Sequence, residues 1–493
     1  MRFVRFSGQT RRGGRLPAAR QGIATPWGRP ARWLMTGAIL LGTAALGLNG
    51  VPAAQAQPVA AVGCSQETLG TAIADASNGA TLSLAPLCIY TLTGSLPVIG
   101  TSITIQGNHA TIQRSGANAT PDFSLLTVGD HGALSITQVT LRNGDGDNGG
   151  GAIFDGGGPL TVTASTLADN SAGTAGTGGA IFADTSTLRV GGSVFTDNRA
   201  DGDKVGLGGA IYADTGLTTI AGSTFDGNVT ESGSENGSIG GAVFNDGSPM
   251  IVTGSIFTDN AAEGKEINPC AKTTAGAKSM ARFMRLARGT SIGNVKIDLS
   301  IDITAVGGAI ASDGPLTVAG SRFTGNAAFT GNAAFTGKND SAVTQCSISP
   351  AAAEQVRGDG GAIFSLGSVS ITNSTYTGNN AFSADAFSAA RSPISPAAND
   401  LAEGDGGAIV SDGELTVTGS RISMNEANGA GGGILSAGTT TLRQSHVLLN
   451  TAGQGGGGIF NFNDGTVTLA GSTVALNDPD NCEPLHTIAG CFS

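Results

Sequence analysis

The chain has 493 residues, of which 79 are glycine and only 13% are charged, and its formal net charge is −11 at pH 7. A chain this acidic repels phosphate backbones, so we do not expect a nucleic-acid partner. The length is sufficient for a sizeable core even though only 5% of the residues are aromatic.

Residues 1–56 have the pattern of a secretory signal. Residues 1–33 contain eight Arg and no acidic residue, and the apolar run "WLMTGAILLGTAALGLNG" follows them. Ala54-Gln55-Ala56 then fits a small-residue cleavage site. Cleavage after Ala56 would leave 437 residues (493 − 56) with a net charge of −19 (−11 − 8). The sequence therefore predicts a secreted or cell-surface protein of a bacterium.

Two other interpretations of this leader stay open. A retained membrane anchor is one, although the apolar run is short for a span and glycines interrupt it. Export through a twin-arginine signal is the other, but Gly13-Gly14 follows Arg11-Arg12 where an apolar pair is expected. The mature chain has no second apolar stretch of spanning length, so we expect no integral membrane span in it.

The six cysteines favour disulfides, because an even number in an exported chain is typical of them. Sequence order suggests three pairs, which are Cys64–Cys88, Cys270–Cys346 and Cys482–Cys491.

Residues 57–143 are expected to form an N-terminal cap and the first, irregular coils. The segment 65–79 fits an amphipathic helix with Ser65 as its N-cap. Short alternating strands follow it, and "LSITQVTLRN", which ends at Asn143, is a degenerate copy of the repeat described next.

Residues 144–477 repeat one pattern nine times. Each copy opens on a glycine pair, which begins at Gly150, Gly178, Gly208, Gly240, Gly307, Gly360, Gly406, Gly431 and Gly456. Each copy closes 19 to 21 residues later on an asparagine, which is Asn170, Asn198, Asn228, Asn260, Asn326, Asn379, Asn425, Asn450 or Asn477.

Three apolar columns run through every copy and predict three short strands per coil. The second copy shows them as Ile181, Val190 and Phe195, within alternating apolar and polar residues. Because one coil cannot bury its own inner face, the coils must stack at about 4.8 Å, strand over strand. The predicted fold class is all-β, a right-handed parallel β-helix. A β-propeller is the competing fold, but its blades need longer repeats of four strands.

The residues at the corners of the coil are expected to be structural. The first glycine suits a turn with positive φ, and asparagine tolerates left-handed backbone and can pair with stacked copies of itself. A serine stands two positions before the third apolar column in all nine copies. A serine nucleophile would need a nearby histidine, and none of the mature chain's four histidines lies in a hydrolase motif.

The long insertions 261–306, 327–359 and 380–405 follow three successive coils. They must leave from one corner, so a single lateral lobe over 261–405 is expected. Within it, 275–289 is basic and is expected to be helical; it could bind an anionic surface or pack on the acidic β-helix. Residues 478–493 break the pattern and are expected to form a C-terminal cap.

Aspartate recurs six residues after the start of several glycine pairs. Asp184, Asp214, Asp246 and Asp313 come from successive coils, so their carboxylates could gather along one edge and bind Ca²⁺. The alternative is a turn residue, because Asp246 and Asp313 each precede glycine. No other cofactor is indicated.

The "GGAI…FxxN" pattern over 140–477 resembles the repeats of chlamydial polymorphic outer membrane proteins. The segment 64–115 is similar to the N-terminal cap of bacterial β-helix proteins of the pectate-lyase type. The resemblance implies surface exposure and adhesion. That family ends in a membrane β-barrel for autotransport, whereas sixteen residues follow Asn477 here, so we expect this protein to be released or held at the surface by others.

Two classes of function are consistent with the sequence. The first is a non-enzymatic adhesion, binding or structural rod that engages a surface polysaccharide or a cell-surface protein. The second is an extracellular lyase or hydrolase that acts on acidic polysaccharide. A lyase needs calcium-binding carboxylates beside an Arg or Lys base, and the sequence shows no convincing cluster of this kind.

Overall fold

The computed structural model describes residues 59–184, 187–202, 205–214, 216–232, 237–264, 303–330, 356–383, 402–462, 465–484 and 488–491. The chain divides into two compact units, Met1–Gln55 and Ala56–Ser493. Every described residue belongs to the second unit, so the leader, Cys270, Cys346 and the basic segment 275–289 lie outside the described residues.

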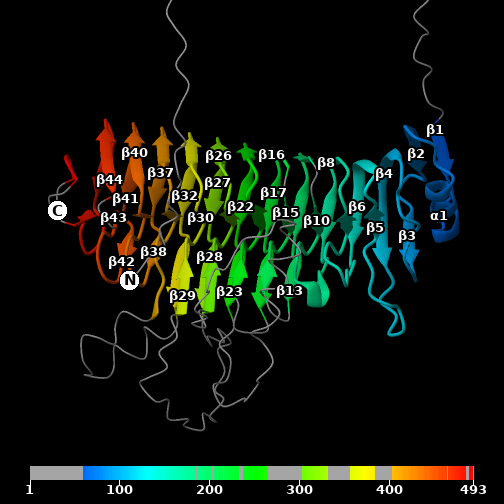
Figure 1. Ribbon diagram of the computed structural model, residues 1–493, viewed down its shortest axis with the longest axis horizontal. Coiled ribbons are helices and arrows are strands. Elements are labelled where there is room, and N and C mark those ends of the chain that lie inside the picture. The colour runs from blue at the N-terminus through cyan, green and yellow to red at the C-terminus, as the bar shows by residue number, and fades with distance from the viewer. Residues whose placement is uncertain are drawn as a thin grey trace, which may run out of the picture. The chain divides into compact units, whose positions relative to one another are not determined.

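Four parallel sheets form the second unit (Figure 1). The largest, sheet A, has 23 strands. Those of the early coils are β1 (Val59–Val62), β2 (Ala80–Leu84), β3 (Ile89–Leu92), β4 (Ser102–Arg114), β6 (Ala133–Arg142), β8 (Leu160–Thr163) and β9 (Thr166–Ala168). Those of the middle coils are β11 (Leu188–Gly191), β12 (Val194–Thr196), β16 (Thr218–Ala221), β17 (Thr224–Asp226), β21 (Met250–Thr253), β22 (Ile256–Thr258), β26 (Leu316–Ala319) and β27 (Arg322–Thr324). Those of the late coils are β31 (Val369–Thr372), β32 (Thr375–Thr377), β36 (Leu415–Thr418), β37 (Arg421–Ser423), β40 (Thr439–Arg443), β41 (His446–Leu448), β44 (Thr466–Ala470) and β45 (Thr473–Ala475).

The three smaller sheets contribute at most one strand each to a coil. Sheet B contains β5 (Leu126–Val128), β7 (Ile153–Asp155), β10 (Ile181–Ala183), β15 (Ile211–Asp214), β20 (Val243–Asp246), β25 (Ile310–Ser312), β30 (Ile363–Ser365), β35 (Ile409–Ser411), β39 (Ile434–Ser436), β43 (Ile459–Asn461) and β46 (Cys482–Glu483). Sheet C contains β13 (Arg199–Gly202), β18 (Val229–Ser232), β23 (Ala261–Gly264), β28 (Ala327–Thr330), β33 (Asn380–Ser383), β38 (Glu426–Ala427) and β42 (Thr451–Ala452). Sheet D contains β14 (Gly206–Leu207), β19 (Ser238–Ile239), β24 (Ile303–Val306), β29 (Val356–Asp359) and β34 (Ala402–Glu403).

Each strand pairs in register with the same strand of the next coil, so the predicted parallel β-helix is confirmed. Ile181 is the partner of Ile211 and also of Ile153. Equivalent residues of successive coils are therefore neighbours, whatever number of residues separates them in the chain. Ile239 and Val306 show this across the longest insertion, because β19 pairs with β24.

The three predicted apolar columns point inward and form one continuous core. Ile181, Val190 and Phe195 are each 2% exposed or less. Phe195, Phe225, Phe257, Phe323 and Tyr376 stack one above the next, with ring centroids 4.7 to 4.8 Å apart. This spacing equals the distance between paired strands, so the ring stack follows directly from the register.

The asparagine column is a buried hydrogen-bonded ladder. The Nδ2 of Asn198 donates to Oδ1 of Asn228 at 2.9 Å and to the backbone carbonyl of Leu167 at 2.9 Å. The same pattern continues to Asn477, whose Nδ2 donates to Asn481 at 3.1 Å. The serine column behaves similarly, because the backbone N–H of Ser193 donates to Oγ of Ser223 at 3.2 Å. Stacked asparagines therefore pair amide to amide along the coils, and stacked serines are linked through their hydroxyls.

The left-handed residue at this corner is not the asparagine, so that part of the prediction is wrong. In every copy it is the residue just before the asparagine, with φ between 51° and 65°; the nine residues are Asp169, Asp197, Gly227, Asp259, Gly325, Gly378, Met424, Leu449 and Leu476. The turn occurs one residue earlier because the asparagine side chain must point inward to reach the next coil.

The glycine pair is required for two different reasons. The first glycine has positive φ, as in Gly208 with φ +64°. A Cβ there would lie 2.0 Å from the carbonyl oxygen of Ile211. The second glycine, Gly209, would place a Cβ 2.1 Å from the carbonyl oxygen of Gly241 in the next coil. The first glycine therefore makes the turn, and the second lets the coils approach.

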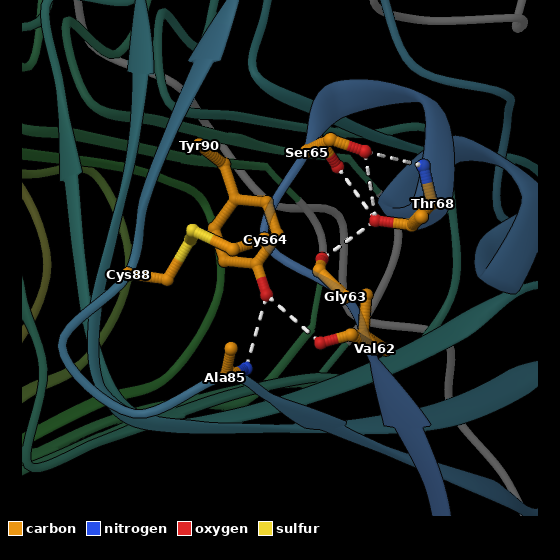
Figure 2. The surroundings of a disulfide bond; sticks show 8 residues. All are labelled: Val62, Gly63, Cys64, Ser65, Thr68, Ala85, Cys88 and Tyr90. Carbon is orange, nitrogen blue, oxygen red and sulfur yellow. Dashed lines mark hydrogen bonds between the residues drawn. A yellow bond between two sulfur atoms is a disulfide. The ribbon is translucent and has the colours of Figure 1, made fainter.

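A short helix covers the first coil, as predicted. It is α1 (Gln66–Ala74), and the Ser65 side chain accepts a hydrogen bond from the Thr68 backbone N–H. The helix ends earlier than the predicted residue 79, and it buries Leu69 and Ile73. Figure 2 shows the disulfide Cys64–Cys88 beside this cap.

The strands of sheets C and D, which lie before and after each insertion, were missed, because the sequence predicted only three strands per coil. Sheets C and D consist of the residues just after each asparagine and just before each glycine pair, which are mostly small. The insertions leave from β23, β28 and β33, which are consecutive partners in sheet C. They return through β24, β29 and β34, which are consecutive partners in sheet D. The expectation that they leave from one corner is therefore confirmed.

Two further elements complete the described part. A 3-10 helix, η1, spans Gly173–Ala175. At the C-terminal end, β46 pairs with β43, and Cys482 forms a disulfide with Cys491. Two of the three suggested disulfides are thus present in the described residues.

Candidate functional site

The aspartates predicted to bind calcium lie at the end of sheet B. Asp214 is the register partner of Asp246, and Asp184 lies on the preceding coil, where its backbone N–H donates to the carbonyl of Asp155. Asp313 is exposed in the turn after β25. The structure therefore brings Asp214 and Asp246 directly together and places the other two on the flanking coils.

At one member of this column, Asp184, the surroundings oppose negative charge. Burial raises the pKa of the Asp184 carboxyl, and the charge of Asp130 raises it further. In the described ranges, no group of three or more His, Cys, Asp or Glu side chains is placed to hold a metal ion. Calcium at this column stays a prediction.

A row of outward-facing aromatic residues borders the aspartates. Phe154, Phe182, Tyr212 and Phe244 follow one another along sheet B, with centroids 5.0, 5.2 and 5.7 Å apart. The Tyr212 hydroxyl donates to Asp246 at 3.4 Å. Burial raises the pKa of Tyr212 strongly, and the neighbouring carboxylates add to this effect. Leu207 and Val306 pack against the row, so its last two residues, Tyr212 and Phe244, belong to a second small core beneath sheet D.

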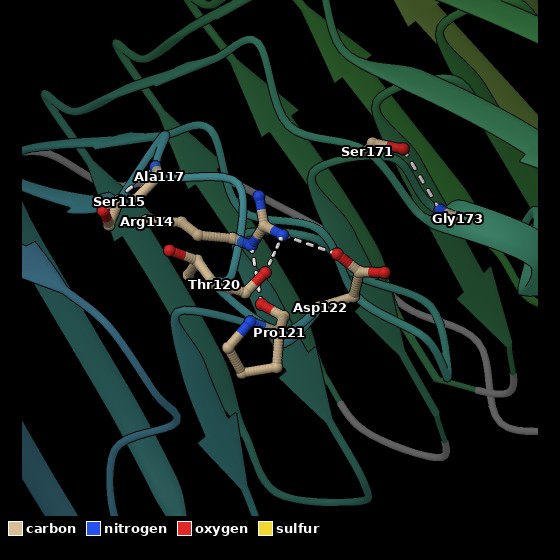
Figure 3. A network of polar contacts seen from close by, with 8 residues as sticks. All are labelled: Arg114, Ser115, Ala117, Thr120, Pro121, Asp122, Ser171 and Gly173. Carbon is tan, nitrogen blue, oxygen red and sulfur yellow. Dashed lines mark hydrogen bonds and ion pairs between the residues drawn. The ribbon is translucent and has the colours of Figure 1, made fainter.

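An arginine lies among carboxylates at a second place, near the N-terminal coils (Figure 3). Arg114 forms an ion pair with Asp122 at 2.5 Å and donates to the carbonyls of Thr120 and Pro121, each at 2.8 Å. Burial and the Asp122 charge raise the pKa of nearby Asp145. Because the guanidinium is engaged by the 115–122 loop, its evident role is to hold that loop against the coils.

The outer face of sheet A is the most regular surface of the protein. One row on it, here called the hydroxyl row, crosses twelve coils in register, and ten of its twelve residues are Thr or Ser. The row contains Thr81, Thr104, Ser135, Thr161, Arg189, Thr219, Ile251, Thr317, Ser370, Thr416, Thr441 and Thr468. Threonine presents a donor, an acceptor and a methyl group at each step.

A second row on the same face carries basic residues. It runs through Thr111, Thr140, Thr166, Val194, Thr224, Ile256, Arg322, Thr375, Arg421, His446 and Thr473. We call it the arginine row. Arg322, Arg421 and His446 are all exposed.

Sequence reasoning missed both the aromatic row and the two outer rows of sheet A. A signal for the first was present, since an aromatic residue directly follows the isoleucine or valine of the glycine-pair motif in Phe154, Phe182, Tyr212 and Phe244. The signal for the hydroxyl row is the pattern Thr-x-Thr, in which two outward threonines flank an inward residue, as in Thr161-Val162-Thr163 and Thr416-Val417-Thr418. The aromatic row and the two outer rows of sheet A all lie outside the inward columns on which the repeat was aligned.

Comparison with known proteins gives no family for this chain: no family model matches it, and no curated protein is significantly similar. In the residues that the structure describes, no helix is both long enough and apolar enough to cross a membrane.

Proposed function

We propose that the protein acts outside the cell as a non-enzymatic binding rod that attaches to a surface polysaccharide or a cell-surface protein. The observation that carries this proposal is the hydroxyl row, which presents a Thr or Ser hydroxyl at ten of twelve successive coils of sheet A. A repeating polymer can contact such a row at many equivalent positions, so that weak contacts add up. The signal-like leader and the resemblance to surface-protein repeats support an extracellular location.

The alternative is an enzyme that cleaves acidic polysaccharide, possible on the same fold. It would require a basic residue available to the substrate beside metal-binding carboxylates. Arg114 lies near carboxylates, but its guanidinium is held by Asp122 and two backbone carbonyls. The arginine row has the opposite composition, with exposed basic residues and few carboxylates.

An array of glycans and cell-surface proteins tests the proposal. The purified protein is expected to be retained on at least one immobilised polymer or surface protein, and uronate polymers incubated with it, with and without calcium, should keep their length. Chain cleavage would favour the enzyme, and absence of retention on every member of the array would contradict the binding rod.

A further inference from the structure

The C-terminal part of the outer face of sheet A is a basic surface on an acidic protein. Five successive coils, from β26–β27 to β44–β45, contribute four positions each to this outer face, of which Ser423 alone is buried. These 20 positions (5 × 4) hold three Arg, one His and no acidic residue. They are Thr317, Ala319, Arg322, Thr324, Ser370, Thr372, Thr375, Thr377, Thr416, Thr418, Arg421, Ser423, Thr441, Arg443, His446, Leu448, Thr468, Ala470, Thr473 and Ala475.

The basic side chains of this face keep their charge available. Arg322, Arg421 and Arg443 are exposed. Within the described residues the ion pairs involve Arg114 and Arg199, and none of the three face arginines takes part in one. Arg421 donates from Nε to the Ser423 hydroxyl at 3.2 Å, which holds the side chain along its strand. The acidic Glu414 borders the face at the preceding turn but does not stand in its rows.

Two of these arginines, Arg322 and Arg421, lie two coils apart on the arginine row. Arg322 is the register partner of Thr375, and Thr375 is the partner of Arg421. Two steps of about 4.8 Å separate the two arginines, so these two positive charges lie about 10 Å apart with the Thr375 hydroxyl between them. An extended chain of equatorially linked hexoses advances by a similar length for every two sugars.

From this arrangement we propose that the face binds a linear polysaccharide that carries one carboxylate on every second sugar, with the chain lying along the stack of coils. The arginines pair with the carboxylates, since guanidinium and carboxylate match in a bidentate geometry. The threonines between them hydrogen-bond the neutral sugars. This inference rests on the proposed binding function and specifies its ligand and its surface.

The chemistry of the face separates this ligand from nucleic acid. Proteins that bind single strands stack the bases on aromatic side chains, and the 20 positions include no Phe, Tyr or Trp. The mature chain also carries a net charge of −19 (−11 − 8). A densely charged phosphate backbone would be repelled by that charge more strongly than a polymer with one carboxylate per two sugars.

Retention of the protein on immobilised polymers tests the proposed ligand directly. The probes are hyaluronan, with a carboxylate on alternate sugars, polygalacturonate, with one on every sugar, a neutral cellulose derivative, and duplex DNA. The wild-type protein is expected to bind hyaluronan most tightly, with affinity that falls as salt is added, because counterions screen the arginines. Tighter binding to the neutral polymer or to DNA would overturn the proposal.

Charge-neutral variants locate the surface. The triple variant R322Q/R421Q/R443Q is expected to weaken hyaluronan binding by at least about thirtyfold, on the scale of several charge-assisted hydrogen bonds. R421Q alone is expected to cost about fivefold. Its matched control is R142Q, because Arg142 is an exposed arginine five coils before Arg322 that belongs to neither row and to none of the 20 positions. This change should alter the affinity less than about twofold. Because these side chains are exposed, all variants should fold.

The outcomes distinguish the two proposals. If the triple variant binds every polymer as the wild type does, the surface is wrong and the binding function stands. If the wild type binds nothing on the wider array, the proposed function itself fails.

Discussion

Asn198 and Asn228 are 30 residues apart in the chain, yet their side-chain amides are joined by a 2.9 Å hydrogen bond. Asn228 also accepts a bond from the Asn198 backbone N–H at 3.2 Å and donates to the Phe195 carbonyl at 3.0 Å. Each amide of the ladder is thus shared between coils. The ladder converts the sequence repeat into a fixed vertical register.

Replacing Asn228 by alanine should therefore be costly. The change leaves buried groups of Asn198, Phe195 and Asn260 without their partner, and each unsatisfied group costs about 1–3 kcal/mol. We expect a loss of about 3 kcal/mol or more in the free energy of unfolding, measured by denaturant titration. Asn118→Ala is the control, because Asn118 is exposed and its backbone is not left-handed. Equal stability of Asn228→Ala and wild type would contradict the ladder's role.

Two glycines with similar backbone conformation should respond differently to alanine. Gly208 has φ +64° and a new Cβ would meet the Ile211 carbonyl, whereas Gly222 has φ +56° and nothing within 4 Å of that position. Gly222→Ala should cost only the left-handed backbone penalty of about 1 kcal/mol. Gly208→Ala adds a backbone clash and should cost several times more, or prevent folding. Thermal midpoints of the two proteins compare them, and equal losses would show that the close contact is unimportant.

Tyr376→Phe should stabilise the protein. The Tyr376 hydroxyl is buried without a hydrogen-bond partner among the described residues, and burial raises the pKa of this phenol. Removing an unsatisfied buried hydroxyl is expected to gain about 1 kcal/mol.

Tyr90→Phe is the matched control and should have the opposite sign. The Tyr90 hydroxyl accepts from the Ala85 backbone N–H at 3.0 Å and donates to the Val62 carbonyl at 3.3 Å (Figure 2). Its loss should cost about 1 kcal/mol. If both Tyr376→Phe and Tyr90→Phe lower the free energy of unfolding, the Tyr376 hydroxyl has a hydrogen-bond partner and the prediction is wrong.

Asp184→Asn should raise stability in a pH-dependent way. A carboxyl whose folded-state pKa is raised, as at Asp184, binds more protons folded than unfolded between its unfolded pKa of about 3.9 and its folded pKa. Ionisation therefore lowers stability as pH rises through that window. The variant should have the higher thermal midpoint at pH 7, and the difference should vanish below about pH 4. Measurements in EDTA exclude calcium effects. A difference that is the same at both pH values would contradict this explanation.

Much of the fold could be predicted from the repeat, because an apolar residue recurs at the same inward positions of every coil. Ile181, Val190 and Phe195 defined the strands, and the glycine and asparagine columns defined the corners. Sheets C and D were not predictable in this way, because the apolar pattern stops at the asparagine. Their strands are held by backbone pairing with the next coil, as between Ala200 and Thr230, which requires no particular side chain.

The candidate surface could be predicted only after the register was known. Arg322 and Arg421 lie 99 residues apart (421 − 322) in the sequence, with the insertions 327–359 and 380–405 between them. Only the pairing of both with Thr375 places them on one row. The predicted aspartates illustrate the converse. Asp214 and Asp246 are direct neighbours, as the sequence column suggested, but the buried Tyr212 beside them was visible only in the structure.

A pair of distances between spin labels on the hydroxyl row tests the stacking of the coils most directly. Thr104 and Thr219 are separated by four coils and 115 residues (219 − 104), whereas Thr219 and Thr416 are separated by four coils and 197 residues (416 − 219). Cysteine variants labelled at these half-buried, outward-pointing positions should give the same backbone separation for both pairs, about 19 Å for four strand spacings. A clearly longer distance for the second pair, in proportion to its extra residues, would contradict the account.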